Sequence, residues 1–152
     1  MIRIVVRAED FDAGAELRLV EGCSPGAGAV ASFIGIVRPE SAGEALLSMT
    51  LEHYPGMTEL ALQQIAAAAC VRWRLSAVTI FHRVGVLQPG AQVVLVAAAS
   101  LHRQAAFDAV QFVMDYLKTK APFWKLERRA SGDHWVEARS SDDEAAARWD
   151  LG

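Results

Sequence analysis

Two apolar runs separated by a short turn constrain the fold of this chain most strongly. Residues 77–85 (AVTIFHRVG) and residues 91–100 (AQVVLVAAAS) are rich in β-branched and small apolar residues, and an LQPG segment lies between them. Runs of this length, bounded by Pro and Gly, are typical of buried strands that are joined by a turn. The sequence therefore predicts a pair of well-buried strands.

The remaining strands and helices follow one another without a strict β-α-β repeat. Further strands are predicted at residues 2–6, 29–37 and 46–54, and helices at residues 11–20, 56–73 and 103–119. Residues 123–129 (FWKLERR) and 134–139 (HWVEAR) are predicted to form a hairpin across an SGD segment. This order favours an α+β fold with a mixed or antiparallel sheet.

Two of the predicted helices carry apolar residues near helical spacing. In the helix at residues 56–73, Thr58 is a candidate cap, and the residues expected to face the core are Leu60, Ile65, Ala68 and Val71. In the helix at residues 103–119, the polar stripe consists of Asp108, Gln111, Asp115 and Lys118, and the opposite face carries Val110, Val113 and Leu117. Both are therefore expected to be amphipathic.

The length and charge of the chain limit its functions. Its 152 residues are expected to form one domain over 1–152, in which the acid-rich segment 141–152 is a helical or mobile tail. The net charge of −3 argues against a general role in binding nucleic acid or membrane surfaces. The segment MIRIVVRAED lacks the apolar core of a signal peptide, so we expect a cytoplasmic protein. Cys23 and Cys70 form no CxxC pair, and neither a disulfide framework nor a metal site is predicted.

Lysines gather around an Ala-Pro step in the segment MDYLKTKAPFWKLERR. Pro122 disfavours helix at the residue before it and turns the chain, so that Lys125 can return alongside Lys118. Two neighbouring amines suit anion binding or amine chemistry. A second cation and apolar rings favour the neutral form of a lysine, which is the form that acts as a nucleophile or general base. The alternative is a solvated helix end, at which Lys118 interacts with the helix dipole and with Asp115.

Other charged residues stand at predicted strand ends. Arg38 closes one strand, and His102 and Arg103 lie where another strand passes into a helix. Such junctions expose backbone N–H groups and favour anions. Taken singly, Arg38 is better explained as a solvated strand-end charge. The alternative for His102 is a helix cap or a buried histidine. His82 lies inside a predicted strand and is interpreted as structural.

Five segments carry a resemblance to a known family: TLEHYPGMTE, HRVG, SLHRQAAF, MDYLKTKAPFWK and WVEAR. In this order and with this spacing they resemble the signature segments of the molybdopterin synthase catalytic (large) subunit family. The resemblance extends from about residue 28 to Trp149 and so covers most of the chain. The chain departs from many relatives after Arg38, where it reads RPESAGEA, and at Ile36, where the family often has Lys.

The resemblance implies an α/β hammerhead fold with a small additional antiparallel subdomain. It also implies a sulfurtransferase of molybdenum cofactor biosynthesis, which converts cyclic pyranopterin monophosphate to molybdopterin by installing two sulfurs as a dithiolene. In the family the sulfur comes from the C-terminal thiocarboxylate of a small ubiquitin-like subunit, so no cofactor and no metal is expected. Two large subunits dimerise within a heterotetramer. Because this chain contains no Gly-Gly tail, the sulfur donor is expected to be a separate chain.

The resemblance also assigns site residues. Lys118 and Lys125 match the catalytic lysines of the family. The other substrate-binding positions match Ile36, Val37, Arg38, His102, Arg103, Leu126, Glu127 and Arg139. We expect Lys118 to meet the carrier's C-terminal carbonyl and assist proton transfer, and Lys125 to stabilise developing negative charge. Arg38 and the His102–Arg103 pair are expected to bind the phosphate, and Arg139 is a candidate for reaching the site of a neighbouring subunit.

Two other functions are compatible with parts of this pattern. A binding-only module would dock the ubiquitin-like carrier without catalysis, but such a module is expected to lack one lysine or part of the anion pocket. A phosphate-ester or nucleotide-processing enzyme could use the same basic cluster. That class usually needs a cluster of metal-binding carboxylates or a Gly-rich phosphate loop, and the sequence contains neither motif.

Overall fold

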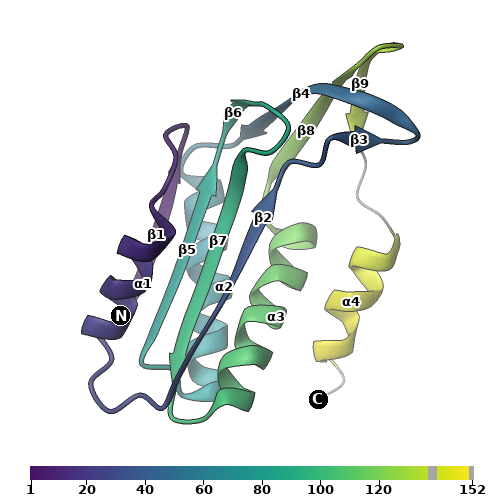
Figure 1. Ribbon diagram of the computed structural model, residues 1–152. Coiled ribbons are helices and arrows are strands. Elements are labelled where there is room, and N and C mark those ends of the chain that lie inside the picture. Colours follow the sequence, from purple (N-terminus) through teal and green to yellow (C-terminus); the bar gives the residue numbers. More distant parts are fainter. Residues whose placement is uncertain (137–139, 151–152) are drawn as a thin grey trace.

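The computed structural model describes residues 1–136 and 140–150, and these residues form two β-sheets and four helices (Figure 1). The first sheet is mixed and has the strand order β1-β5-β7-β2. Its strands are β1 (Ile2–Arg7), β5 (Ala77–Arg83), β7 (Gln92–Ser100) and β2 (Ala29–Ile36). β1 runs parallel to β5, and the other neighbours are antiparallel. The predicted pair of buried strands thus forms the centre of this sheet.

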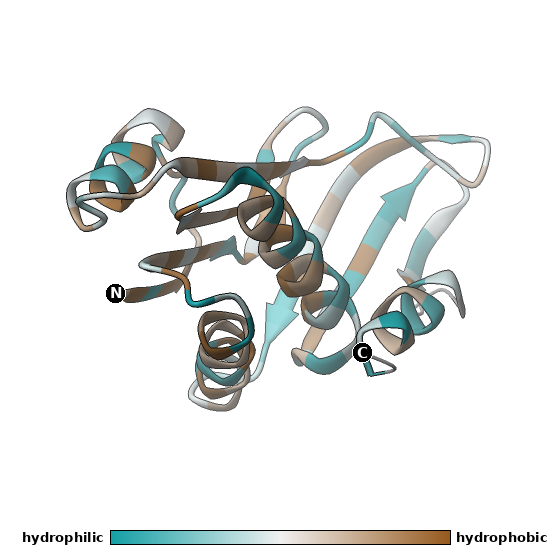
Figure 2. Cartoon of the chain, turned by 90° about the horizontal axis from the view of Figure 1, so that it is seen from below, coloured by the Kyte–Doolittle hydropathy of each residue, from teal (hydrophilic) through white to brown (hydrophobic). Residues whose placement is uncertain are grey.

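Helices cover both faces of the first sheet. Because side chains alternate along a strand, Val78 and Ile80 of β5 pack into the main core with α2 (Met57–Trp73) and α3 (Arg103–Lys120). Ala77 of β5 points the other way and packs with Val20 of α1 (Ala13–Gly22). Figure 2 shows that the strands of this sheet are mostly hydrophobic, and the two central strands, β5 and β7, are buried on both faces.

The second sheet is antiparallel and has the order β3-β4-β8-β9. It consists of β3 (Glu40–Ser41), β4 (Glu44–His53), β8 (Phe123–Arg129) and β9 (Gly132–Val136), and the short β6 (Gly85–Leu87) also pairs with β4. β8 and β9 form the predicted hairpin, with the turn at residues 130–131 rather than at SGD. The mixed α+β architecture with an additional antiparallel sheet is confirmed.

The chain passes from α3 into β8 at the predicted proline. Ala121 ends the helix with an extended backbone, φ −84° and ψ 134°, as expected before Pro122. The buried hydroxyl of Thr58 donates a 3.0 Å hydrogen bond to the carbonyl of Pro122 and accepts one of 3.0 Å from the N–H of Tyr54. These two bonds fix the start of β8 against the turn that leads into α2.

Helix α4 (Ser140–Asp150) forms from the predicted acidic tail and lies alongside α3 (Figure 1). The ring of Trp149 packs edge-on against Trp73 and Phe112, with centroid distances of 5.4 and 5.7 Å. Its indole Nε1 donates a 2.8 Å hydrogen bond to Asp115. Aromatic packing and a partly buried hydrogen bond therefore attach α4 to the helical layer.

Three details predicted from the sequence are wrong. Leu60, Ala68 and Val71 of α2 are exposed, and Leu62 and Ala66 pack in the core instead. Apolar residues of this Ala-rich helix occur on several of its sides, so their spacing alone does not identify the buried face. The cap of α2 is Gly56 rather than Thr58, whose hydroxyl is used elsewhere.

The third detail concerns the polar stripe of α3. Val110, Val113 and Leu117 are buried as predicted, but Asp115 is buried as well, because α4 covers it.

Both cysteines are free; Cys23 is exposed and Cys70 is partly buried. None of the helices in the described ranges is long and apolar enough to cross a membrane.

Candidate functional site

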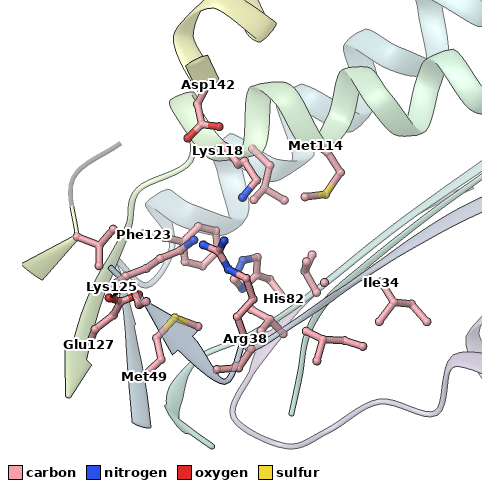
Figure 3. A pocket seen from close by; sticks show the side chains of 18 of the residues that line it. Ile34, Arg38, Met49, His82, Met114, Lys118, Phe123, Lys125, Glu127 and Asp142 are labelled. Atoms are coloured by element: carbon pink, nitrogen blue, oxygen red, sulfur yellow. Dashed lines mark hydrogen bonds between the residues drawn. The ribbon is translucent and has the colours of Figure 1, made fainter. Parts of the chain in front are cut away.

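A cavity of about 540 Å³ opens between the first sheet, the C-terminal end of α3 and the second sheet. Its walls come from segments that are far apart in the sequence: β2 and the residues after it, β4, β5, α3 and β8. The lining residues that carry polar or sulfur atoms include Arg38, Met49, His82, Met114, Lys118, Lys125, Glu127 and Asp142 (Figure 3). Cationic groups therefore face a cavity large enough for a small ligand.

Lys118 and Lys125 both reach this cavity. Lys118 is exposed on the last turn of α3, and Lys125 is partly buried on β8. Figure 3 shows their side chains pointing toward each other and toward Arg38. Within the described residues, neither lysine makes a hydrogen bond or an ion pair. The bend at Pro122 thus brings the two amines together as the sequence predicted, and leaves them available to an anionic ligand.

The surroundings of Lys125 favour its neutral form. Burial lowers the pKa of Lys125, and the nearby charges of Lys118 and Arg38 lower it further. Asp142 and Glu127 act on this pKa in the opposite direction but do not cancel the effect. Proton exchange at Lys125 is therefore easier near neutral pH than at an ordinary lysine.

Arg38 enters the cavity from the end of β2 (Figure 3). The backbone before it is fixed, because the N–H of Val37 donates to the carbonyl of Ala91 at 2.9 Å and the carbonyl of Val37 accepts from Gly90 at 2.8 Å. The side chain of Val37 is buried, whereas Ile36 is exposed at the cavity wall. A rigid strand end therefore presents the guanidinium group.

Glu127 forms part of the wall and has partners of its own. Its Oε1 accepts hydrogen bonds from Ser41 at 2.6 Å and from Arg129 at 2.6 and 3.0 Å. Burial alone would raise the pKa of Glu127, but these hydrogen bonds outweigh it and hold the pKa below its ordinary value. Through its hydrogen bond with Ser41, Glu127 joins β3 to β8.

In the described part of the chain, no group of three His, Cys, Asp or Glu side chains is placed to hold a metal ion.

Comparisons with known proteins agree with this arrangement. The sequence profile described as MoaE protein matches residues 6–120. The molybdopterin synthase catalytic subunit of Pseudomonas aeruginosa is 54% identical over 147 residues, which cover 97% of this chain and 98% of that protein. The chain belongs to the MoaE family of molybdopterin synthase catalytic subunits. The resemblance found in the sequence is thereby confirmed.

Solved structures of MoaE proteins have the same fold. The molybdopterin biosynthesis MoaE protein from Burkholderia ambifaria MC40-6 is 49% identical and superposes with a TM-score of 0.86 over the whole of both chains. A complex of subunits 1 and 2 of molybdopterin-converting factor from Helicobacter pylori 26695 contains a chain of similar fold. That chain is 20% identical, with a TM-score of 0.71 that covers 91% of this chain and 92% of the other.

The structure brings together most of the positions that the MoaE resemblance assigns. Those that line the cavity are Ile36, Val37, Arg38, Lys118, Lys125 and Glu127. Leu126 does not line it: because side chains alternate along β8, it lines a small groove on the opposite face of the second sheet. Arg139 lies outside the described residues.

His102 and Arg103 lie far from the cavity of their own chain. Both are exposed at the start of α3, whereas Lys118 is on its last turn. A helix rises about 1.5 Å per residue, so the 18 residues of α3 span about 27 Å. One small ligand cannot touch both ends. The side chain of His102 also makes no capping hydrogen bond, although His102 is the residue at the helix start.

His82 is the functional candidate that the sequence interpretation missed. It lies within β5 as predicted, but its side chain lines the cavity beside the two lysines (Figure 3). The only signal in the sequence was the HRVG segment of the MoaE resemblance. The position of His82 relative to the lysines depends on contacts between β5 and β8 that spacing along the chain does not reveal.

Proposed function

We propose that this chain converts cyclic pyranopterin monophosphate to molybdopterin by installing two sulfurs as a dithiolene. Each sulfur arrives as the C-terminal thiocarboxylate of a small ubiquitin-like subunit. The observation that carries the proposal is the convergence of Lys118, Lys125 and Arg38 on one cavity, in a member of the MoaE family. Because the sulfur arrives on the carrier, the reaction as proposed needs no resident cofactor.

The two lysines are proposed to have different roles. Lys118 is exposed at the helix end, so an arriving carrier tail can reach it, and it would contact the carbonyl of the tail. Lys125 is partly buried, and its ammonium form would stabilise negative charge on the substrate. Its lowered pKa suits it to give up a proton as that charge develops.

Arg38 is the proposed ligand of the substrate phosphate. A guanidinium group can donate two parallel hydrogen bonds to phosphate, and the fixed strand end limits the backbone entropy that is lost on binding. His102 and Arg103 would contribute only if a second copy of the chain placed its α3 start at this cavity. That requirement agrees with the expected pairing of large subunits within a heterotetramer.

The sulfur carrier is proposed to bind as a separate small subunit. The Helicobacter pylori protein of similar fold was solved in a complex of two subunits, which supports this assembly. The cavity lies at the surface beside exposed Lys118, so the tail of a second chain could enter it.

Reconstitution tests the proposal. Purified protein would be mixed with thiocarboxylated small subunit and cyclic pyranopterin monophosphate, and molybdopterin would be measured as its fluorescent oxidised derivative. We expect product that depends on the thiocarboxylate, with unmodified small subunit as the control. Binding of the small subunit without any product would contradict the proposal and favour a docking module.

A further inference from the structure

The imidazole of His82 lies at the inner wall of the cavity. Val78, Ile80 and His82 share one face of β5, and the first two are completely buried in the main core. His82 is only 4% exposed, yet it lines the cavity into which Lys118 and Lys125 project (Figure 3). It is therefore a polar group held where the core meets the site.

One ring nitrogen of His82 is already used. Nδ1 lies 2.8 Å from the carbonyl oxygen of Arg83. A carbonyl only accepts hydrogen bonds, so Nδ1 must carry the proton and Nε2 must carry a lone pair in the neutral ring. Within the described part of the chain, this is the one hydrogen bond of the imidazole. Nε2, at the tip of the side chain, remains an acceptor without a partner.

The ring of His82 is also fixed in orientation. It stacks on the ring of Phe123, with a centroid distance of 3.9 Å and an interplanar angle of 19°. Phe123 precedes Lys125 by two residues, so both lie on the same face of β8. Burial, together with the charges of Lys125 and Lys118, lowers the pKa of His82 to about 4. The imidazole is therefore neutral at neutral pH.

We propose that His82 is a substrate-binding residue, whose Nε2 accepts a hydrogen bond from a ring N–H of the pterin. This inference rests on the proposed function. Arg38 and the protonated lysines only donate hydrogen bonds, so they suit the phosphate and carbonyl oxygens of the substrate. The N–H groups of a pterin ring need an acceptor. A neutral acceptor meets that need and keeps the positive charge that attracts the phosphate. A carboxylate acceptor would cancel part of that charge.

Two substitutions separate this role from a structural one. In His82→Asn, the amide can still donate to the carbonyl of Arg83 but reaches no further, so the acceptor at the Nε2 position is lost. In His82→Gln, the longer amide places an acceptor near that position and gives up the donor at Nδ1. If His82 only anchors the backbone, His82→Asn should be tolerated better than His82→Gln. If His82 accepts a hydrogen bond from the substrate, His82→Gln should be tolerated better.

The test is substrate affinity, measured by calorimetry, together with KM and kcat at saturating small subunit. For His82→Asn we expect Kd and KM to rise about five- to tenfold with little change in kcat, since a neutral hydrogen bond is worth about 1 kcal/mol. His82→Gln should stay within about threefold of the wild type. His134→Asn, on β9 and outside the cavity, is the matched control. Wild-type affinity in His82→Asn, or a greater loss in His82→Gln, would overturn the proposal.

A measurement on the wild type does not depend on how the variants fold. With ¹⁵N-labelled histidine, saturating substrate should shift the Nε2 resonance of His82 and leave Nδ1 nearly unchanged. An unchanged Nε2 resonance with substrate bound would overturn the contact while leaving the sulfurtransferase function intact. If the wild type neither binds nor converts the pterin, the proposed function fails and the contact fails with it.

Discussion

The carboxylate of Asp115 on α3 accepts a 2.8 Å hydrogen bond from the indole nitrogen of Trp149 on α4. Asp115 is 8% exposed and also accepts from Gln111 at 3.2 Å. Lys118 follows Asp115 by three residues, and Asp142, near the other end of α4, lines the cavity. The bond between Asp115 and Trp149 therefore helps to hold α4 beside the candidate site.

Trp149→Phe should lower the free energy of unfolding by about 1–3 kcal/mol. The substitution keeps the aromatic packing against Trp73 and Phe112 but removes the donor to a buried carboxylate. Urea unfolding measures the change. Arg148→Ala is the control, because Arg148 is largely exposed and its 3.4 Å ion pair with Asp115 should contribute less than about 1 kcal/mol. Equal losses in the two variants would contradict this account.

His82 should make the fold less stable in mild acid. Its pKa is about 4 in the folded protein, below the ordinary value of 6.5, so the unfolded chain binds the proton more readily between these values. The stability contributed by neutral His82 is present above pH 6.5 and is lost as the pH falls toward 4. Between pH 7 and pH 5 the loss is about 2 kcal/mol.

Urea unfolding at pH 7 and pH 5 checks this dependence. His82→Gln should show a decrease in stability between the two pH values that is smaller than the wild-type decrease by about 2 kcal/mol. His134→Gln should retain the wild-type decrease, because it removes a histidine from the β9 hairpin instead. Identical pH dependence in the wild type and His82→Gln would show that His82 is not held in its neutral form.

Lys118→Gln should raise the pKa of Lys125. The substitution removes a neighbouring positive charge that holds this pKa down. An NMR titration of the Lys125 side-chain amine measures the change directly. Lys120→Gln is the matched control, since Lys120 is exposed at the same helix end and does not line the cavity. A pKa that responds equally to both substitutions would mean that Lys118 has no specific effect on Lys125.

Glu127→Gln should lower the free energy of unfolding by about 1–3 kcal/mol at pH 7. Glu127 and Arg129 are both largely buried, and their charged groups lie 2.6 Å apart. The neutral amide removes this close anionic partner and leaves the guanidinium only its 3.9 Å ion pair with Glu44. Arg128→Gln, on the same strand, removes an exposed pair with Asp133 and should cost less than about 1 kcal/mol. Denaturant unfolding that ranks the two variants the other way would contradict the structural role of Glu127.

Local sequence signals predicted the strands and the lysine bend because each depends on neighbouring residues. The apolar runs of β5 and β7 indicate burial on both faces, and Pro122 ends α3 through its own steric effect on Ala121. The buried face of α2 was not predictable in this way, since Leu60 and Leu62 are equally apolar and only the packed fold distinguishes them.

The missed parts of the site depend on long-range contacts. His82 approaches Lys125 because β5 and β8 meet through the stacked ring of Phe123, and no spacing along the chain reveals that meeting. Asp115 belonged to a regular polar stripe, but α4 folds back over it and buries it. His102 and Arg103 share a helix with Lys118, yet they lie at its other end.

A single-turnover measurement tests the central claim, that Lys118 takes part in sulfur transfer. Limiting cyclic pyranopterin monophosphate would be mixed with an excess of the wild type, Lys118→Ala or Lys120→Ala, each saturated with thiocarboxylated small subunit, and the rate of molybdopterin formation recorded. We predict that Lys118→Ala slows the reaction by about 100-fold or more while Lys120→Ala stays near the wild-type rate. Equal rates in Lys118→Ala and Lys120→Ala would contradict the claim.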